Sequence, residues 1–336
     1  MVVNGAGGAV ARRYNAPMDE LTPVIVSASR TTDIPALYGE WLLRRLRAGW
    51  CEWVNRFNGR RHRVSFERTR AIVFWSKNPA PLIPRLAEID ELGINSYFTL
   101  TLNDYEREGL EPGIPPLAER IETFRRLAGR VGRERVVWRF DPIIVGRHLP
   151  PEAILERIAR IGAAVHPHTR KLVISFADIE RYPAARRRIG EAAGGLREPG
   201  PAAIARIAAG IAALNRDWGL EVATCAEAVD LSGLGIGRNR CVDDELLARA
   251  FPGDAALLDF LGRGAGSGEC TGGGAPGGIA HPLKDRGQRA ACGCIVSKDI
   301  GRPGTCALGC AYCYANASHA AAAAAHARHD PGEASL

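Results

Sequence analysis

The chain has 336 residues, of which 46% are hydrophobic and 24% charged, a profile typical of soluble globular proteins with one large core or two smaller ones. No stretch is apolar over the roughly 20 residues that a membrane helix needs, so we expect no membrane partner. Residues 1–22 lack a signal-peptide core and are interpreted as a disordered extension. A cytoplasmic protein is therefore predicted, and there nine cysteines favour metal or redox chemistry over disulfides.

The formal net charge of +7 raises the question of nucleic acid binding. Only four of the 44 basic residues are lysine, and the arginine-rich stretches 43–47 and 125–136 lie within helical patterns. Charge on such a pattern usually marks a solvated helix face. We therefore expect a small-molecule substrate and keep a nucleic acid as the alternative.

Six short segments rich in β-branched and aromatic residues predict strands buried on both faces of a parallel sheet. They are residues 24–29, 71–76, 96–102, 136–141, 172–178 and 221–227. Apolar residues at helical spacing lie between them, near residues 41–46, 82–86, 117–127, 154–161 and 204–214. This alternation predicts βαβ units over residues 23–230, arranged as a (β/α)6-type or TIM-like barrel. Residues 51–67 are predicted to add a hairpin to the first crossover.

The character of the chain changes beyond residue 230. Glycines and cysteines become frequent, and residues 262–278 are predicted to form a loop. We interpret residues 231–336 as a cysteine-rich segment that completes the barrel. The alanine-rich stretch 316–329 predicts a helix, and the last dozen residues a frayed tail.

Polar residues follow each predicted strand, at the barrel rim where catalytic groups collect. Arg139 and Asp141 alternate along one strand, so both point inward if Trp138 points outward. Some strand-end residues are instead expected to be helix caps, and the sequence after Asp33 has that pattern. The candidates for holding cofactor and substrate are Arg30, Asp33, Lys77, Arg139, Asp141 and Glu227.

Three cysteines near the C-terminus have a distinctive spacing. Cys306, Cys310 and Cys313 form C-x3-C-x2-C within "TCALGCAYCYAN". Thiolates bind zinc or iron–sulfur clusters, and structural zinc sites favour paired C-x2-C units. Three clustered cysteines without an adjacent fourth therefore indicate a [4Fe–4S] cluster with one open iron.

This motif, with Tyr312 before the third cysteine, resembles the cluster motif of the radical SAM superfamily. The resemblance implies that the three cysteines hold the cluster, that the open iron chelates S-adenosylmethionine, and that Tyr312 lies against the adenine. It also implies a six-stranded α/β barrel, an electron donor such as flavodoxin or ferredoxin, and reductive cleavage to a 5′-deoxyadenosyl radical. Rim residues Lys77, Arg139, Asp141 and Glu227 would then be catalytic, with Arg30 and Asp33 at the cofactor.

A second resemblance spans nearly the whole chain. "SASRTTDIPALYGEW", "VFWSKNPAPL", "VVWRFDPI", "ISFAD" and the segment from "KDRGQRAACGC" to "CYAN" are similar to signature segments of the DUF1848 family of bacterial and archaeal proteins. In radical SAM proteins the cluster loop follows the first strand, whereas here it follows "GCIVSKD" near the C-terminus. If "CIVS" is a strand, the chain is predicted to be a circular permutation of that barrel.

Four further cysteines, Cys225, Cys241, Cys292 and Cys294, form a candidate second site for zinc or another [4Fe–4S] cluster. The alternative is that Cys225 and Cys241 are ordinary buried residues. Cys51 and Cys270 are assigned no role. Three functions stay open: a radical SAM-type enzyme on a small molecule, a nucleic-acid repair or modification enzyme of the same type, and a non-catalytic barrel with a structural zinc module.

Overall fold

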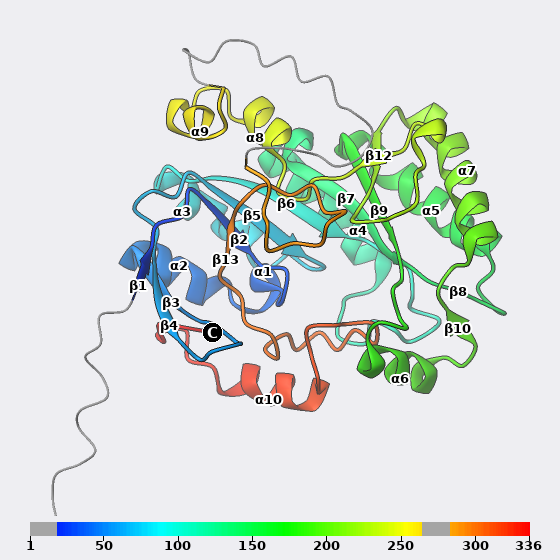
Figure 1. The fold of residues 1–336 in the computed structure, drawn as a ribbon, viewed down its shortest axis with the longest axis horizontal. Coiled ribbons are helices and arrows are strands. Elements are labelled where there is room, and N and C mark those ends of the chain that lie inside the picture. The colour runs from blue at the N-terminus through cyan, green and yellow to red at the C-terminus, as the bar shows by residue number, and fades with distance from the viewer. Residues whose placement is uncertain (1–18, 264–282) are drawn as a thin grey trace, which may run out of the picture.

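A computed structural model describes residues 19–263 and 283–336 (Figure 1). Its centre is an eight-stranded sheet in the order β12-β11-β9-β7-β6-β5-β2-β13, and every pairing in it is parallel. The strands are β2 (Ile25–Ala28), β5 (Ala71–Ser76), β6 (Asn95–Thr101), β7 (Val136–Ile143), β9 (Lys171–Phe176), β11 (Glu221–Thr224), β12 (Gly237–Arg238) and β13 (Lys298–Asp299). All six strands predicted from the sequence are confirmed, and they lie side by side in chain order.

The two faces of this sheet are covered differently. Side chains such as Phe74, Phe98 and Trp138 face helices on the outer face, where they share one hydrophobic core with residues of α2, α4, α5 and α7. Residues of opposite parity, such as Val73, Tyr97 and Val137, face the inner face, which the cysteine-containing segments around residues 241 and 292–295 cover together with α8 and α9. This alternation is the consequence of strands buried on both sides.

The helices follow the predicted pattern between strands. In the described part of the chain they are α1 (Ile34–Leu37), α2 (Gly39–Ala48), α3 (Leu86–Glu91), α4 (Leu117–Val131), α5 (Pro151–Val165), α6 (Pro183–Ala192), α7 (Pro201–Trp218), α8 (Asp244–Ala250), α9 (Ala255–Phe260) and α10 (His319–Arg328). Helix α10 is the helix expected after the cysteine loop. None of the helices in the described ranges is long and apolar enough to span a bilayer.

The sheet is not a closed barrel in the described residues. The two strands at its ends, β12 and β13, pair with β11 and β2 respectively, and no described pairing joins them to each other. The expectation of a TIM-like closed barrel is therefore not met, and the fold is an open parallel α/β sheet. Described residues between these end strands, around Cys241 and at 292–295, instead cover the inner face, and the orange segment before β13 lies in front of the sheet in Figure 1.

The long first crossover forms the predicted hairpin. Strands β3 (Trp50–Val54) and β4 (Arg61–Ser65) pair antiparallel, and β1 (Asp19–Leu21) adds in parallel to β4. The expected disordered extension of residues 1–22 is therefore corrected at its end, because residues 19–21 are a paired strand; residues 1–18 lie outside the described ranges. A two-stranded sheet joins β8 (Val145–Gly146) to β10 (Leu196–Arg197).

The C-terminal residues are packed rather than frayed, which corrects the expectation for the last dozen residues. The Trp41 indole donates to the carbonyl of Glu333 at 3.0 Å, and the amide of Glu52 donates to the carbonyl of Ala334 at 2.8 Å. The Leu336 side chain is buried in the outer core. The predicted glycine-rich loop falls largely on residues 264–282, outside the described residues.

Candidate functional site

The three-cysteine loop lies between β13 and α10. Strand β13 pairs in parallel with β2, so the loop leaves the sheet at the carboxyl edge, where the segments after β2, β5 and β6 also begin. Parallel α/β sheets bind ligands at this edge. The predicted strand "CIVS" is four residues too early, because β13 is Lys298–Asp299 and Ile295 makes only an isolated bridge with Lys284.

Side chains from distant parts of the chain hold the loop through its carbonyl groups. Arg188 of α6 donates to Ala311 at 3.1 Å, to Asn316 at 3.2 Å and to Cys313. The Tyr38 hydroxyl donates to the carbonyl of Thr305 at 2.7 Å. A charged donor shared among several carbonyls fixes a loop that has no regular hydrogen bonding of its own.

Close backbone contact also fixes this loop. The amide of Gly113 donates to the carbonyl of Leu308 at 3.1 Å, and a Cβ at position 113 would lie 2.6 Å from that oxygen. Only glycine allows this approach without displacement. The amide of Ala311 donates to the carbonyl of Leu110 at 2.8 Å, so the loop after β6 and the cysteine loop are joined twice.

The thiols of this loop are shielded from solvent. Cys310 is buried, whereas Cys306 and Cys313 are partly buried. Burial raises the pKa of Cys310 well above its ordinary value, and burial followed by the nearby Asp33 carboxylate raises the pKa of Cys306 to about 11. Cys306, Cys310 and Cys313 lie near enough to one another to interact electrostatically. Without a partner cation, Cys306 and Cys310 are therefore neutral thiols at neutral pH.

A buried polar network faces the cysteine loop. Lys77 Nζ lies 2.9 Å from Glu111 Oε1 and donates to the Tyr312 hydroxyl at 2.7 Å. Tyr312 in turn donates to Glu111. Burial alone would raise the pKa of Glu111, but Lys77 and then Arg120 outweigh it and hold that pKa below its usual value. Tyr312 therefore has its hydroxyl engaged within the protein, and its ring contacts Lys77 and Tyr105.

Asp33 caps helix α1, as predicted, and also links the ends of two strands. Its carboxylate accepts from the amide of Ala36 at 3.1 Å as the N-cap of α1, and from Ser76 Oγ and the amide of Lys77 at 2.7 Å. Asp33 thus ties the ends of β2 and β5 together beside Cys306.

Arg139, Asp141 and Glu227 lie along the carboxyl half of the inner face. Trp138 packs in the outer core, so Arg139 points inward as predicted, and it pairs with Asp141. Burial would raise the pKa of Asp141, but Arg139 and then Ser175 keep it below its usual value. Glu227 accepts from the amide of Phe176 at 2.8 Å, and burial raises its pKa.

The four other cysteines come together on the inner face. Cys225 Sγ lies 3.4 Å from Cys241 Sγ, and the amide of Cys241 donates to Cys294 Sγ at 3.2 Å. Hydrogen bonding with Cys241 and with Cys292 lowers the pKa of Cys294. The structure thus brings together the four cysteines that the sequence grouped as a candidate second site, although they span positions 225 to 294. Cys51 lies apart from them in β3, and Cys270 is outside the described residues.

Arg30 lies beside this four-cysteine cluster (Cys225, Cys241, Cys292 and Cys294). Burial disfavours its charge, but Cys294, Asp299 and Cys241 outweigh that effect, and the pKa of Arg30 is raised. Its guanidinium stacks over the Trp75 ring with 5.0 Å to the centroid, and Arg139 lies over the same ring at 5.3 Å. Two guanidiniums therefore lie beside the thiols, and both contact the same indole ring.

Within residues 19–263 and 283–336, no group of three or more His, Cys, Asp or Glu side chains is arranged to hold a metal ion as it stands. Ligation at either cysteine group therefore requires rotation of thiol side chains. The donor chemistry nevertheless suits thiophilic metals, because both groups consist of free, shielded thiols.

Several residues of the site were not predicted. Glu111 follows β6 in a loop with other acidic residues, and its spacing does not distinguish it from Glu106 or Glu108. Arg188 is one of three consecutive arginines on α6, and the sequence does not distinguish it from its two neighbours. Only the packing of α6 against the loop identifies the arginine that binds it.

Fold and site together define an α/β protein with an open parallel sheet, a three-cysteine loop at the carboxyl edge and a four-cysteine cluster on the inner face. The family model described as Domain of unknown function (DUF1848) matches residues 25–315, and the chain belongs to this family. No curated protein matches the chain, and no solved structure matches it either.

Proposed function

We propose that this protein is an iron–sulfur enzyme of the radical SAM type that acts on a small molecule. Cys306, Cys310 and Cys313 would hold a [4Fe–4S] cluster with one iron left open for S-adenosylmethionine. When bound, such a cluster supplies the electron for reductive cleavage of that cofactor. The observation that carries the proposal is a three-thiol loop, with no cysteine next to it as a fourth ligand, at the carboxyl edge of a parallel sheet.

The order of the strands supports a circularly permuted barrel. Strand β13 comes last in the chain but lies next to β2, the first strand of the large sheet. If the chain began at β13, its strands would follow the order of the sheet, with the cysteine loop after the first strand and α10 after the loop. This is the layout that the radical SAM resemblance implies, in an open rather than a closed form.

The surrounding residues would position the loop and exclude water. Arg188 and Tyr38 hold its carbonyls, and Gly113 lets the backbones approach. The buried Lys77–Glu111 pair holds the Tyr312 hydroxyl and thereby fixes the residue before the third cysteine. Asp141 and Glu227 supply carboxylates further along the same edge.

The test is reductive cleavage of S-adenosylmethionine. Anaerobically reconstituted protein incubated with the cofactor and dithionite is expected to release 5′-deoxyadenosine, measured by liquid chromatography. Cys310→Ala should abolish the product and leave the sheet folded by circular dichroism. Cys51→Ala, which changes a buried cysteine of β3 away from the loop, should leave product formation unchanged.

Absence of 5′-deoxyadenosine from a protein with its full iron and sulfide content would contradict the proposed reaction. Zinc in place of iron, together with unfolding of the C-terminal segment in Cys310→Ala, would indicate the structural module instead.

A further inference from the structure

The four-cysteine cluster brings together three separate segments. Cys225 follows β11, Cys241 follows β12, and Cys292 and Cys294 precede β13. Cys241 contacts Cys225 through sulfur at 3.4 Å and contacts Cys294 through its amide at 3.2 Å. These contacts join the segments that carry Cys241 and Cys294, which lie on the inner face, to the end of strand β11.

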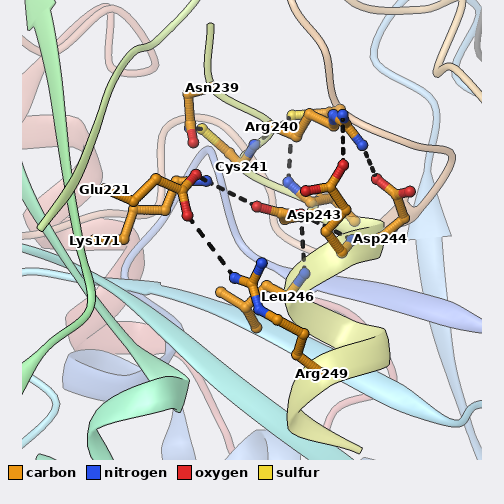
Figure 2. Close-up of polar contacts among 12 residues, drawn as sticks. Lys171, Glu221, Asn239, Arg240, Cys241, Asp243, Asp244, Leu246 and Arg249 are labelled. Carbon is orange, nitrogen blue, oxygen red and sulfur yellow. Dashed lines mark hydrogen bonds and ion pairs between the residues drawn. The ribbon is translucent and has the colours of Figure 1, made fainter. Parts of the chain in front are cut away.

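The loop that carries Cys241 is fixed by a polar network beneath it (Figure 2). Lys171 Nζ lies 2.8 Å from both Asp243 Oδ2 and Glu221 Oε1. The Tyr97 hydroxyl donates to the carbonyl of Cys241 at 2.6 Å and accepts from the amide of Asp243 at 3.1 Å. A network of this kind around the buried Lys171 and Asp243 holds one loop conformation.

The Cys292-Gly-Cys294 turn packs tightly against the same loop. A Cβ at Gly293 would lie 2.9 Å from Arg240 Cγ and 3.1 Å from the carbonyl oxygen of Asn239, so glycine is required between the two cysteines. On the opposite side, Ala226 next to Cys225 has φ of 56°, the left-handed region that non-glycine residues rarely adopt. Such strained backbone tends to persist at ligand sites.

Cys241 Sγ and Cys294 Sγ each accept two hydrogen bonds, which is more than is expected of a neutral thiol. Arg139 Nη1 donates to Cys241 Sγ at 2.9 Å and Asn239 Nδ2 at 2.8 Å. Cys294 Sγ accepts from the amides of Cys241 and Val242 at 3.2 and 3.4 Å. A neutral thiol is a weak acceptor, whereas a thiolate is a strong one. These donors are therefore positioned to stabilise thiolates at Cys241 and Cys294.

Charge balance then indicates a dication. Four thiolates would be opposed by only two guanidiniums, those of Arg30 and Arg139, and one Arg30 nitrogen, Nη2, is buried without a hydrogen-bond partner in the described residues. A divalent ion would neutralise the remaining charge. Buried charge that lacks compensation is costly, so four thiolates would form at this site only together with such a cation.

The sulfur spacing favours one ion. Tetrahedral zinc with Zn–S bonds of about 2.3 Å places its sulfurs about 3.8 Å apart. The 3.4 Å between Cys225 and Cys241 is close to this value, and both thiols are free, not joined as a disulfide. In a [4Fe–4S] cluster each thiolate binds a different iron, which separates the sulfurs further.

We propose that Cys225, Cys241, Cys292 and Cys294 form a tetrathiolate site for a single tetrahedral divalent ion, zinc. The site stands independently of the cluster proposed at Cys306, Cys310 and Cys313. With four protein ligands it is a closed, structural site. It fastens the connection between β12 and β13 across the inner face, and thereby holds β13 and the three-cysteine loop in place.

The test is the zinc and iron content of the full chain and its variants, measured by elemental analysis. The unmodified protein and Cys51→Ser should each contain about one zinc per chain. Cys292→Ser should lose at least nine-tenths of it, and Cys310→Ser should keep it. Loss of four irons and their sulfide in Cys292→Ser, with no zinc in the unmodified protein, would overturn the single-ion site in favour of a cluster.

A second measurement avoids any dependence on the folding of variants. Treatment of the unmodified chain with a mercurial thiol reagent should release one zinc ion, detected with a colorimetric chelator. Release of no metal, with all four thiols titrating as free or as disulfides, would also overturn the proposal.

Discussion

The two cysteine groups differ in how the chain builds them and in what surrounds them. The three-cysteine loop takes its thiols from eight consecutive residues and lies beside the buried Lys77–Glu111 pair. The four-cysteine cluster takes its thiols from three segments and is enclosed by Arg30 and Arg139. Three clustered thiols without a fourth ligand would leave one metal position open for a reaction, whereas four enclosed thiols would fill every position around a structural ion. The predictions below test this division, from the largest expected effect to the smallest.

Arg139→Met should produce the largest change, because buried Arg139 pairs with partly buried Asp141 and donates to Cys241. Removal of one partner of a buried pair costs about 3–5 kcal/mol, so the free energy of unfolding should fall by that order. Chemical denaturation measures it. The matched control is Arg170→Met. Arg170 forms an exposed pair with Glu134, so its loss should lower the free energy of unfolding by less than about 1 kcal/mol. Equal losses in the free energy of unfolding of the two variants would contradict a special stabilising role for Arg139.

Arg188→Ala should loosen the three-cysteine loop without affecting the four-cysteine cluster. Charged hydrogen bonds to the carbonyls of Ala311, Asn316 and Cys313 are lost, with an expected cost of about 2 kcal/mol. Hydrogen exchange of residues 305–316 should quicken, and iron retention should fall several-fold while zinc stays constant. Arg187→Ala is the control, because Arg187 is exposed and pairs only with Glu191. Unchanged exchange in Arg188→Ala would contradict the anchoring role.

Much of the fold could be predicted from the sequence, because burial on both faces imposes a local pattern. The six apolar segments gave the strands and their order, and "NASHAAAAAAHARH" gave α10. Closure of the sheet could not be predicted, since β12 and β13 are two residues each and carry no apolar period. Their positions depend on tertiary packing.

The candidate site, like the fold, could be predicted where the signal is local and not where it depends on tertiary packing. The spacing of Cys306, Cys310 and Cys313 is a local signal, and strand-end polarity identified Lys77, Asp33 and Arg139. Cys225, Cys241, Cys292 and Cys294 were grouped as a candidate site from the sequence, but their contacts depend on tertiary packing on the inner face and not on their spacing. Glu111 and Arg188 were missed because each resembles its charged neighbours until packing buries it.

Gly113→Ala should weaken the contact between the loop after β6 and the cysteine loop. The added Cβ would lie 2.6 Å from the carbonyl oxygen of Leu308, so the backbones must separate, at about 1–2 kcal/mol. Gly129→Ala in α4 is the control, since its Cβ meets nothing within 4 Å and should stabilise the helix by about 0.5–1 kcal/mol. Thermal unfolding of both variants measures the effects, and the same sign in both would contradict the contact.

Acidification should release the C-terminal segment by a smaller amount. His326 and His329 pack edge-on against Tyr38 with ring centroids 5.0 Å apart, and burial lowers the pKa of both below 6.5. The unfolded segment therefore binds more protons below pH 6.5, so the stabilisation is complete above that pH and declines as the pH falls.

Hydrogen exchange of α10 between pH 7.5 and 5, corrected for the intrinsic rate, measures this dependence. The double variant His326→Asn and His329→Asn should flatten it, whereas His148→Asn, at an exposed position, should not. A pH dependence that survives the double variant would assign it to other groups.

The division between the two cysteine groups is tested most directly by iron, acid-labile sulfide and zinc per chain on anaerobically purified protein. The prediction is about four irons, about four sulfides and about one zinc. In the variant that changes Cys306, Cys310 and Cys313 to alanine, iron and sulfide should disappear while zinc remains. Iron unaffected by that triple change, or zinc with no iron at all, would contradict the assignment of the reactive cluster to the three-cysteine loop.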